Sequence, residues 1–294
     1  MAGLRATMSE QIDHIERWRR IVAARRAQHD AVCAQQGRTT DDYWSRRAEG
    51  FQKHVHESAG VRDPFLDLLV AHLRPDDVVL DAGAGPGRHT LALAHHAARV
   101  IALDPSAAML RFLREELAGQ GIANVEVVEG AWPDAAERLP QVDVAISAHV
   151  LYPIEDVVPF LRALDGRARR LCFLHLMVWQ PWFDQLGLWE AVYGEARLPQ
   201  PVAIDAVNVL YQLGCYANVA VAWAEAPRTF DSLDDAFERV AETVAVGDDA
   251  NRRARLREAL AAQLDAIDGG RLRARVLRYP LATVWWEAGA LQKG

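Results

Sequence analysis

The spacing of hydrophobic residues predicts a regular alternation of strands and helices through the middle of the chain. Five short apolar runs have the length of a strand: residues 77–83, 99–104, 125–130, 142–149 and 169–178. Between them, apolar residues recur at three- and four-residue spacing, as they do in amphipathic helices. This β-α-β-α alternation is typical of a mostly parallel sheet with helices on both faces.

The chain before the first of these strands is predicted to be helical. Residues 8–35 place apolar side chains along one face, and the opposite face is rich in arginine. We expect this helix to pack on the domain or on a second subunit. Two further helical stretches follow, one from Asp41 and one from Asp63. Residues 1–40 are therefore expected to form an N-terminal helical extension.

The last third of the chain is less regular. Strand-like runs at 216–226 and 282–287 complete a predicted seven-stranded sheet. Insertions are expected at about 179–215, where aromatic residues gather, and at about 230–270, where two amphipathic helices are predicted. Together they predict a helical lid near the C-terminus, over a substrate pocket. The aromatic residues expected to line that pocket are Trp179, Trp182, Trp189, Tyr193 and Tyr211.

Composition and charge narrow the class of protein. Half of the 294 residues are hydrophobic, which is ample for a large core, and the net charge of -7 argues against a nucleic-acid or anionic-membrane partner. Three widely spaced cysteines give no disulfide framework. No secretory signal and no apolar run of membrane-spanning length is seen. We expect a cytoplasmic protein.

A glycine-rich turn follows the first predicted strand of the sheet, in the sequence VVLDAGAGPGRHT at 78–90. Such a turn lets a ligand approach the backbone closely, and the next helix directs its N–H groups toward that ligand. A dinucleotide fingerprint would need a glycine at position 88, where Arg88 stands. The carboxylate of Asp81, before the glycines, would repel a pyrophosphate and attract a cationic ligand.

This turn resembles motif I of the class I (Rossmann-like) S-adenosylmethionine-dependent methyltransferases. Asp81 and the glycines Gly83, Gly85 and Gly87 match the acid and the glycines of that motif, and Asp104 matches the acid that binds the ribose. The resemblance covers residues 41–178 well and the last third in outline. It implies S-adenosyl-L-methionine as the cofactor and a methyltransferase domain over 41–294.

The resemblance also implies contacts around the rest of the cofactor. Ala131 stands where the family often has an acid for the adenine amino group, so backbone groups and the ring of Trp132 are expected there instead. The residues from Tyr43 resemble the family's entrance helix, which closes over the methionine end. The expected cofactor-binding residues are Tyr43, Trp44, Arg47, Asp81, Gly83, Gly85, Gly87, Asp104, Pro105, Gly130, Ala131, Trp132, Ser147 and His149.

By the same resemblance, the methyl acceptor binds just beyond the fourth strand, at SAHVLYPIED. His149 is the candidate catalytic base there, because an ordinary histidine titrates near neutrality. We expect transfer to an O or N atom of a small molecule, because motifs typical of nucleic-acid methylation are missing. No metal site is expected. Two alternative functions stay open: methylation of RNA or protein, and a non-catalytic regulator that binds the cofactor. A homodimer also stays open, and a nicotinamide oxidoreductase is disfavoured.

Overall fold

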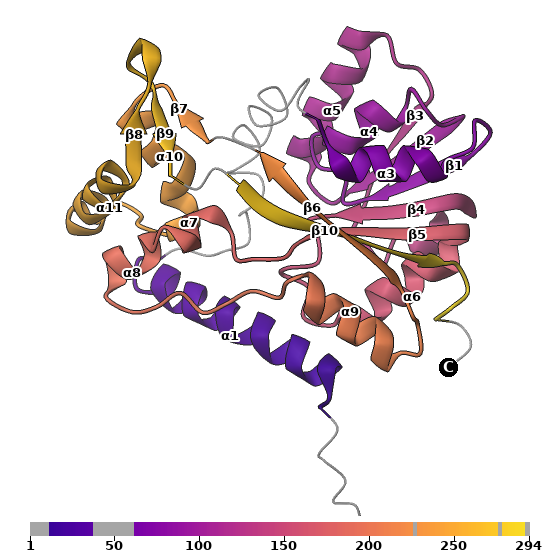
Figure 1. Ribbon diagram of the computed structural model, residues 1–294, viewed down its shortest axis with the longest axis horizontal. Helices are drawn as coiled ribbons and strands as arrows, with labels where there is room; N and C mark the ends of the chain where they lie inside the picture. Colours follow the sequence, from indigo (N-terminus) through magenta and orange to yellow (C-terminus); the bar gives the residue numbers. More distant parts are fainter. Residues whose placement is uncertain (1–11, 38–61, 226–227, 276–277, 292–294) are drawn as a thin grey trace, which may run out of the picture.

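The computed structural model describes residues 12–37, 62–225, 228–275 and 278–291, and it has two lobes (Figure 1). The larger lobe contains a seven-stranded sheet of order β3-β2-β1-β4-β5-β10-β6, which confirms the predicted fold class. Its strands are β1 (Val78–Ala82), β2 (Arg99–Asp104), β3 (Val125–Glu129), β4 (Val142–Ala148), β5 (Ala168–Met177), β6 (Asn218–Glu225) and β10 (Arg278–Glu287). The first five are parallel, and β10 runs antiparallel between β5 and β6.

Helices cover both faces of this sheet. On one face, Phe65 and Leu69 are completely buried against apolar residues of the central strands. On the other, Phe160 and Val209 pack into the largest core cluster. The helices of the larger lobe are α3 (Pro64–His72), α4 (Arg88–Leu93), α5 (Ala107–Gln120), the short 3-10 turn η1 (Ala136–Arg138), α6 (Val157–Arg167) and α9 (Ala203–Gln212). None of the described helices has the length and apolar character needed to cross a bilayer.

The smaller lobe has a core of its own around Phe230, Phe237 and Leu256. The two amphipathic helices predicted at 230–270 are present, but a three-stranded sheet of order β7-β9-β8 accompanies them. Its strands escaped prediction because two or three residues carry no readable alternation. The lobe consists of α7 (Trp182–Gln185), α8 (Leu188–Tyr193), β7 (Thr229–Phe230), α10 (Leu233–Val244), α11 (Ala250–Gln263), β8 (Leu264–Ala266), η2 (Asp268–Gly270) and β9 (Leu272–Ala274).

The N-terminal helix α1 (His14–Ala34) packs against both lobes of the same chain (Figure 1). Near its start, the indole of Trp18 is buried in the larger core and donates to the carbonyl of Ile154 at 2.7 Å. Near its end, Val32 and Cys33 pack against Trp189 of α8. One amphipathic helix therefore joins two separate hydrophobic cores.

A buried ion pair fastens the middle of α1 to the smaller lobe. Arg25 Nη2 lies 2.7 Å from Asp184 Oδ2, and the two side chains are only 14% and 9% exposed. Burial raises the pKa of Asp184, although the neighbouring Arg25 opposes the rise. The carboxylate therefore depends on this guanidinium to remain charged without a large penalty.

We expect Arg25→Ala to lower the free energy of unfolding by about 3–5 kcal/mol, because it leaves a buried carboxylate unpaired. Arg26→Ala is the matched control one position along the helix. The Arg26–Glu155 pair is 48% and 39% exposed, so its loss should cost about 1 kcal/mol or less. Urea unfolding of both variants measures the difference, and equal losses would contradict a special role for Arg25.

Candidate functional site

The glycine turn lies at the carboxyl end of β1, between β2 and β4. The N–H groups of Gly83 and Ala84 both donate to the carbonyl of Leu103, at 2.8 and 3.0 Å. The N–H of Gly85 donates to Asp104 Oδ2 at 2.9 Å. These bonds hold the turn against the end of β2, at the edge of the sheet where ligands of open α/β folds bind.

Two of the three glycines are required by close packing as well as by backbone conformation. Gly83 has φ +91°, and a Cβ there would lie 2.3 Å from Val150 Cγ2. Gly87 has φ +98°, and a Cβ there would lie 2.4 Å from Leu113 Cδ1. Gly85 has φ +55°, but a Cβ would meet no described atom within 4 Å. The open side of the turn is therefore at Gly85.

Asp81 is buried at the end of β1 rather than exposed in the turn. It is 2% exposed, and one carboxylate oxygen accepts a hydrogen bond from the hydroxyl of Thr90 on α4 at 2.7 Å. Burial raises its pKa, and the Asp104 carboxylate adds to the rise, while His89 and Thr90 act in the opposite direction. Asp81 thus links the strand to the helix behind the turn.

Asp104, at the end of β2, is partly buried and already has two backbone partners. Its oxygens accept from the N–H groups of Gly85 and Ser106, each at 2.9 Å. Burial raises the pKa of Asp104, and these two hydrogen bonds offset only part of the rise. A carboxylate has about four acceptor positions, so it retains the capacity to accept from a ligand as well.

The residues expected near adenine follow β3. The N–H of Gly130 donates to the carbonyl of Asp104 at 3.1 Å, while Pro105 and Ala131 are exposed beside it. The indole of Trp132 donates to the carbonyl of Phe160 at 3.1 Å, and its ring lies edge-on to the Phe160 ring. These contacts tether Trp132 next to the larger core, so its stacking on adenine stays a prediction.

Ser147 lies inside the sheet. It is completely buried, and its hydroxyl donates to the carbonyl of Ala82 at 2.9 Å, which joins β4 to the end of β1. Its side chain therefore supports the strand ends instead of presenting its hydroxyl to a ligand.

His149, immediately after β4, has an unusual backbone and a satisfied ring nitrogen. Its φ of +60° lies in the left-handed region, and its N–H donates to the carbonyl of His175 at 2.9 Å. Its Nδ1 lies 2.8 Å from the hydroxyl of Tyr152. That hydroxyl in turn accepts from the N–H of Met177 at 2.8 Å. Burial lowers the pKa of His149 well below its usual value, and His175, Arg88 and His89 add to the effect, so the ring is neutral at neutral pH.

Behind His149 lies a cluster that the sequence did not reveal. The ring of His175 on β5 stacks on Phe65 at 4.4 Å and lies 4.9 Å from the His149 ring. Burial lowers the pKa of His175 to about 3. Asp63, which caps α3, lies 3.4 Å from His89 Nε2 and 2.9 Å from Arg88 Nη2.

This cluster combines residues from four separate elements. No grouping of histidine, cysteine and acid that could hold a metal ion was found among the described residues. Only spatial proximity unites Asp63, His89 and His175, so no sequence spacing could have indicated the cluster. The sequence did place Arg88 in the turn, and its partner Asp63 explains how a cation is accommodated there.

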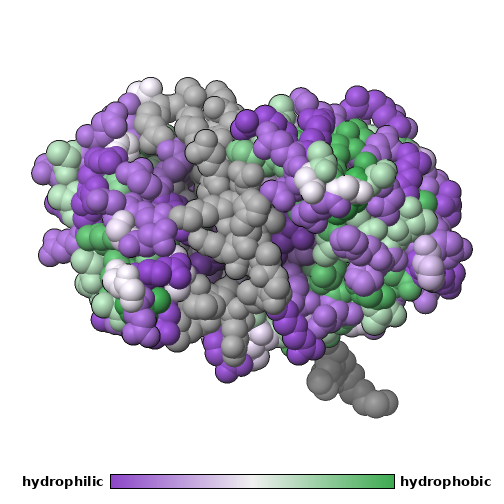
Figure 2. All heavy atoms as spheres, turned by 90° about the horizontal axis from the view of Figure 1, so that it is seen from above, coloured by the Kyte–Doolittle hydropathy of each residue, from purple (hydrophilic) through white to green (hydrophobic). Residues whose placement is uncertain are grey.

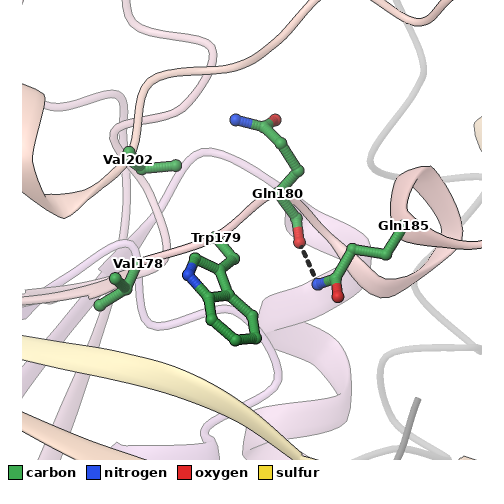
Figure 3. Close-up of a pocket in the computed structure, with 5 residues that line it drawn as sticks. All are labelled: Val178, Trp179, Gln180, Gln185 and Val202. Carbon is green, nitrogen blue, oxygen red and sulfur yellow. Dashed lines mark hydrogen bonds between the residues drawn. The ribbon is translucent and has the colours of Figure 1, made fainter.

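A pocket of about 410 Å³ opens just beyond β5, between the two lobes (Figure 3). It is lined by Val178, Trp179, Gln180, Gln185 and Val202. The Gln185 side-chain amide donates to the carbonyl of Gln180 and braces the pocket wall. Along the chain, the pocket wall begins one residue after Met177, whose N–H donates to Tyr152, the partner of His149.

The predicted aromatic lining is only partly correct. Trp179 is 48% exposed in the pocket wall, but Trp189 on α8 is 2% exposed and packs against Val32 and Cys33 of α1. Tyr193 donates from its hydroxyl to the carbonyls of Val244 and Ala245, and Trp182 packs on the core of the smaller lobe. Most of these aromatics are core residues because the smaller lobe has its own interior. The predicted entrance residues Tyr43, Trp44 and Arg47 lie outside the described residues.

Comparison with known proteins bears on the same region. Residues 79–168 match the model of a family described as "Methyltransferase domain". These residues run from β1 to the start of β5 and include the glycine turn, Asp104 and His149. For the residues that it covers, about a third of the chain, the match bears out the methyltransferase family and the S-adenosyl-L-methionine cofactor predicted from motif I.

Individual relatives match only parts of this chain. An uncharacterized protein of Haemophilus influenzae is 30% identical over 152 residues, which are 52% of this chain and 56% of that protein. A protein-L-isoaspartate O-methyltransferase of Methanoregula boonei is 37% identical over 73 residues, 24% of this chain and 34% of that protein. These matches thus span about half of the first relative and about a third of the second.

A solved structure of similar fold is that of the YcgJ protein from Bacillus subtilis. It is 17% identical, covers 76% of this chain and 99% of its own, and has a TM-score of 0.50. This likeness extends to the fold alone.

Gly83→Ala should destabilise the protein by about 2–4 kcal/mol, because it adds both a left-handed alanine and a clash with Val150. Gly85→Ala, with a similar backbone but open space, should cost only about 1 kcal/mol. Adding Val150→Ala to the first variant should recover part of the loss. Thermal melting of the three variants without ligand measures these differences, and an equal effect at both glycines would rule out the clash.

Proposed function

We propose that this protein transfers a methyl group from S-adenosyl-L-methionine to an O or N atom of a small molecule. The observation that carries the proposal is the glycine turn, with its open side at Gly85 and the Asp104 carboxylate bonded beside it. The Asp104 carboxylate can accept hydrogen bonds from the two ribose hydroxyls of the cofactor. Backbone N–H groups at the start of α4 suit the rest of the cofactor. When bound, the cofactor supplies a methyl group already activated by a sulfonium charge.

The remaining chemistry is alignment and exclusion of water. In this proposal Gly85 admits the cofactor close to the backbone, and Asp104 binds its ribose. Asp81 acts from behind the turn through Thr90, so it fixes the geometry and contributes negative potential. The acceptor binds beside His149, in the direction of the pocket at Trp179.

The hydrogen-bond network supports a role for His149 other than that of a base. Tyr152 accepts from Met177, so its own proton is best placed in the bond to His149 Nδ1. Burial raises the pKa of Tyr152, which keeps that proton on the phenol. The neutral imidazole then carries its hydrogen on Nε2. We infer that His149 donates from Nε2 to the acceptor and orients it. A lone pair of the acceptor would then attack the methyl group, the bond from methyl to sulfur would break to leave S-adenosylhomocysteine, and the proton that the acceptor loses would pass to solvent.

The charge distribution supports a small-molecule acceptor over RNA. Figure 2 shows a mostly hydrophilic face over the lobe that holds α10 and α11, but many arginines of that lobe and of α1 are already in ion pairs. Paired cations of this kind leave little positive potential for a phosphate backbone. The described pairs include Arg17–Asp205, Arg25–Asp184, Arg26–Glu155, Arg257–Asp234, Arg271–Asp231 and Arg275–Asp265. Two further expectations stay predictions. One is a cytoplasmic location. The other is a single methyltransferase domain over 41–294 whose insertions form a mobile lid.

S-adenosylhomocysteine should raise the melting temperature of the protein, and NADH should not. Asp104→Ala should abolish the shift because it removes the acceptor of the ribose hydroxyls. Asp134→Ala, an exposed acid in the loop after β3, is the control and should keep it. A shift that survives in Asp104→Ala would refute the assignment of that residue.

Turnover, measured with the best acceptor from a panel of phenols, amines and thiols, should show no ionisation of His149 between about pH 6 and about pH 8. His149→Asn keeps a donor and should be about tenfold faster than His149→Leu, which keeps none. A pH-rate limb near 6.5 that disappears in His149→Asn would instead identify a general base.

A further inference from the structure

In the part of the chain that the structure describes, the outer edge of the larger sheet is a strand with one free side. β6 is the last strand of the sheet order, and among the described strands it pairs only with β10. Its sequence, NVAVAWAE, has no lysine, arginine or proline. Soluble proteins usually protect edge strands with such residues, because a free row of N–H and C=O groups recruits another strand.

One face of β6 is also apolar and uncovered. Val219, Val221 and Trp223 alternate onto the same side and are 46%, 57% and 49% exposed. They pair across to Val284, Ala282 and Pro280 of β10, and Val284 and Ala282 belong to the core on the α9 side of the sheet. α9 packs on β5 and β10 at this face, and the β6 side chains beyond it remain open to solvent.

Other exposed aromatic residues adjoin this strand. The ring of Trp179 lies edge-on to Trp223 at 5.3 Å. Tyr211, near the end of α9, contacts Tyr216, two residues before β6, at 5.5 Å, and these two are 62% and 79% exposed. We call Trp179, Tyr211, Tyr216, Val219, Val221 and Trp223 the β6 patch.

We propose that the β6 patch is the two-fold interface of a homodimer, in which β6 pairs antiparallel with β6 of a second copy. The strand is complementary to itself in one register. With Val221 on the two-fold axis, each Val221 faces its own copy and each Val219 faces Trp223 of the other chain. Aromatic and β-branched residues are favourable cross-strand neighbours.

The size and charge of the patch suit a second copy. Its six side chains expose on the order of 700 Å² of surface. Pairing of the two β6 edges would set these side chains of both copies side by side on one face of the joined sheet, so one apolar surface provides both halves of the contact. None of the six is charged, and the charged group that adjoins Trp223 is the guanidinium of Arg278, 5.7 Å from its ring centre, so the patch itself brings no like charges together despite the net charge of -7. The sheet would then continue from one copy into the other.

The first test is the mass of the full chain in solution, by sedimentation equilibrium over a range of concentrations. The wild-type protein should be a dimer, and Val221→Lys should be a monomer, because it sets two ammonium groups against each other on the axis. Leu198→Lys, another exposed apolar residue outside the patch, should stay dimeric. A wild-type monomer at all concentrations would refute the proposal and leave the patch for another partner. A Val221→Lys variant that stays dimeric with an unchanged melting temperature would also refute the proposal.

Cross-linking tests the register. Val221→Cys should form a disulfide-linked dimer on mild oxidation, because its Cβ would lie about 4.5–5.5 Å from its own copy. Val219→Cys should not, because its copy would lie four residues away along the strand, roughly 13 Å. The natural cysteines Cys33, Cys172 and Cys215 are buried, which keeps the background low. Cross-linking through Val219→Cys but not Val221→Cys would overturn the register.

Discussion

The placement of α1 across two hydrophobic cores is the constraint on which the two-lobed structure depends. Trp18 belongs to the core beneath the sheet, and Val32 and Cys33 belong to the contact with α8. A single helix is stiff over this length, so it fixes the distance between the two cores. The buried pair of Arg25 and Asp184 fixes its rotation as well. The pocket at Trp179 lies where the chain crosses from one lobe to the other, so its shape follows from this attachment.

The site itself is built from groups that satisfy one another before any ligand is present. Asp104 accepts a hydrogen bond from the N–H of Gly85, and Asp81 accepts one from the hydroxyl of Thr90. The hydroxyl of Tyr152 is hydrogen-bonded to both Met177 and His149. Preorganised groups of this kind need little rearrangement when a ligand binds. The donor role that we propose for His149 rests on the same network, because its Nδ1 already has a partner in Tyr152.

The sequence was sufficient for the parts of the molecule that depend on local pattern. The alternation of strands and helices, the glycine turn and Asp104 all follow from residues close together in the chain. The histidine cluster could not be predicted, because Asp63, His89 and His175 meet only after the helices pack on the sheet. The tautomer that we propose for His149 rests on a backbone N–H from another strand. Trp189 was misjudged because nothing local distinguishes an aromatic residue in a second core from one in a pocket wall.

The central position of β10 has a consequence for how the protein is made. β10 lies between β5 and β6 in the sheet, yet it is synthesised after both of them. Its C-terminal end is fixed to Asp165, which accepts from the indole of Trp286 and from the N–H groups of Gly289 and Leu291. Until β10 is synthesised, β6 has no neighbour in the sheet. This apolar strand therefore stays exposed while about fifty more residues are added to the chain. A nascent chain of this protein is therefore an expected client for chaperones that bind extended apolar segments, and early termination of translation would leave the sheet open in its middle.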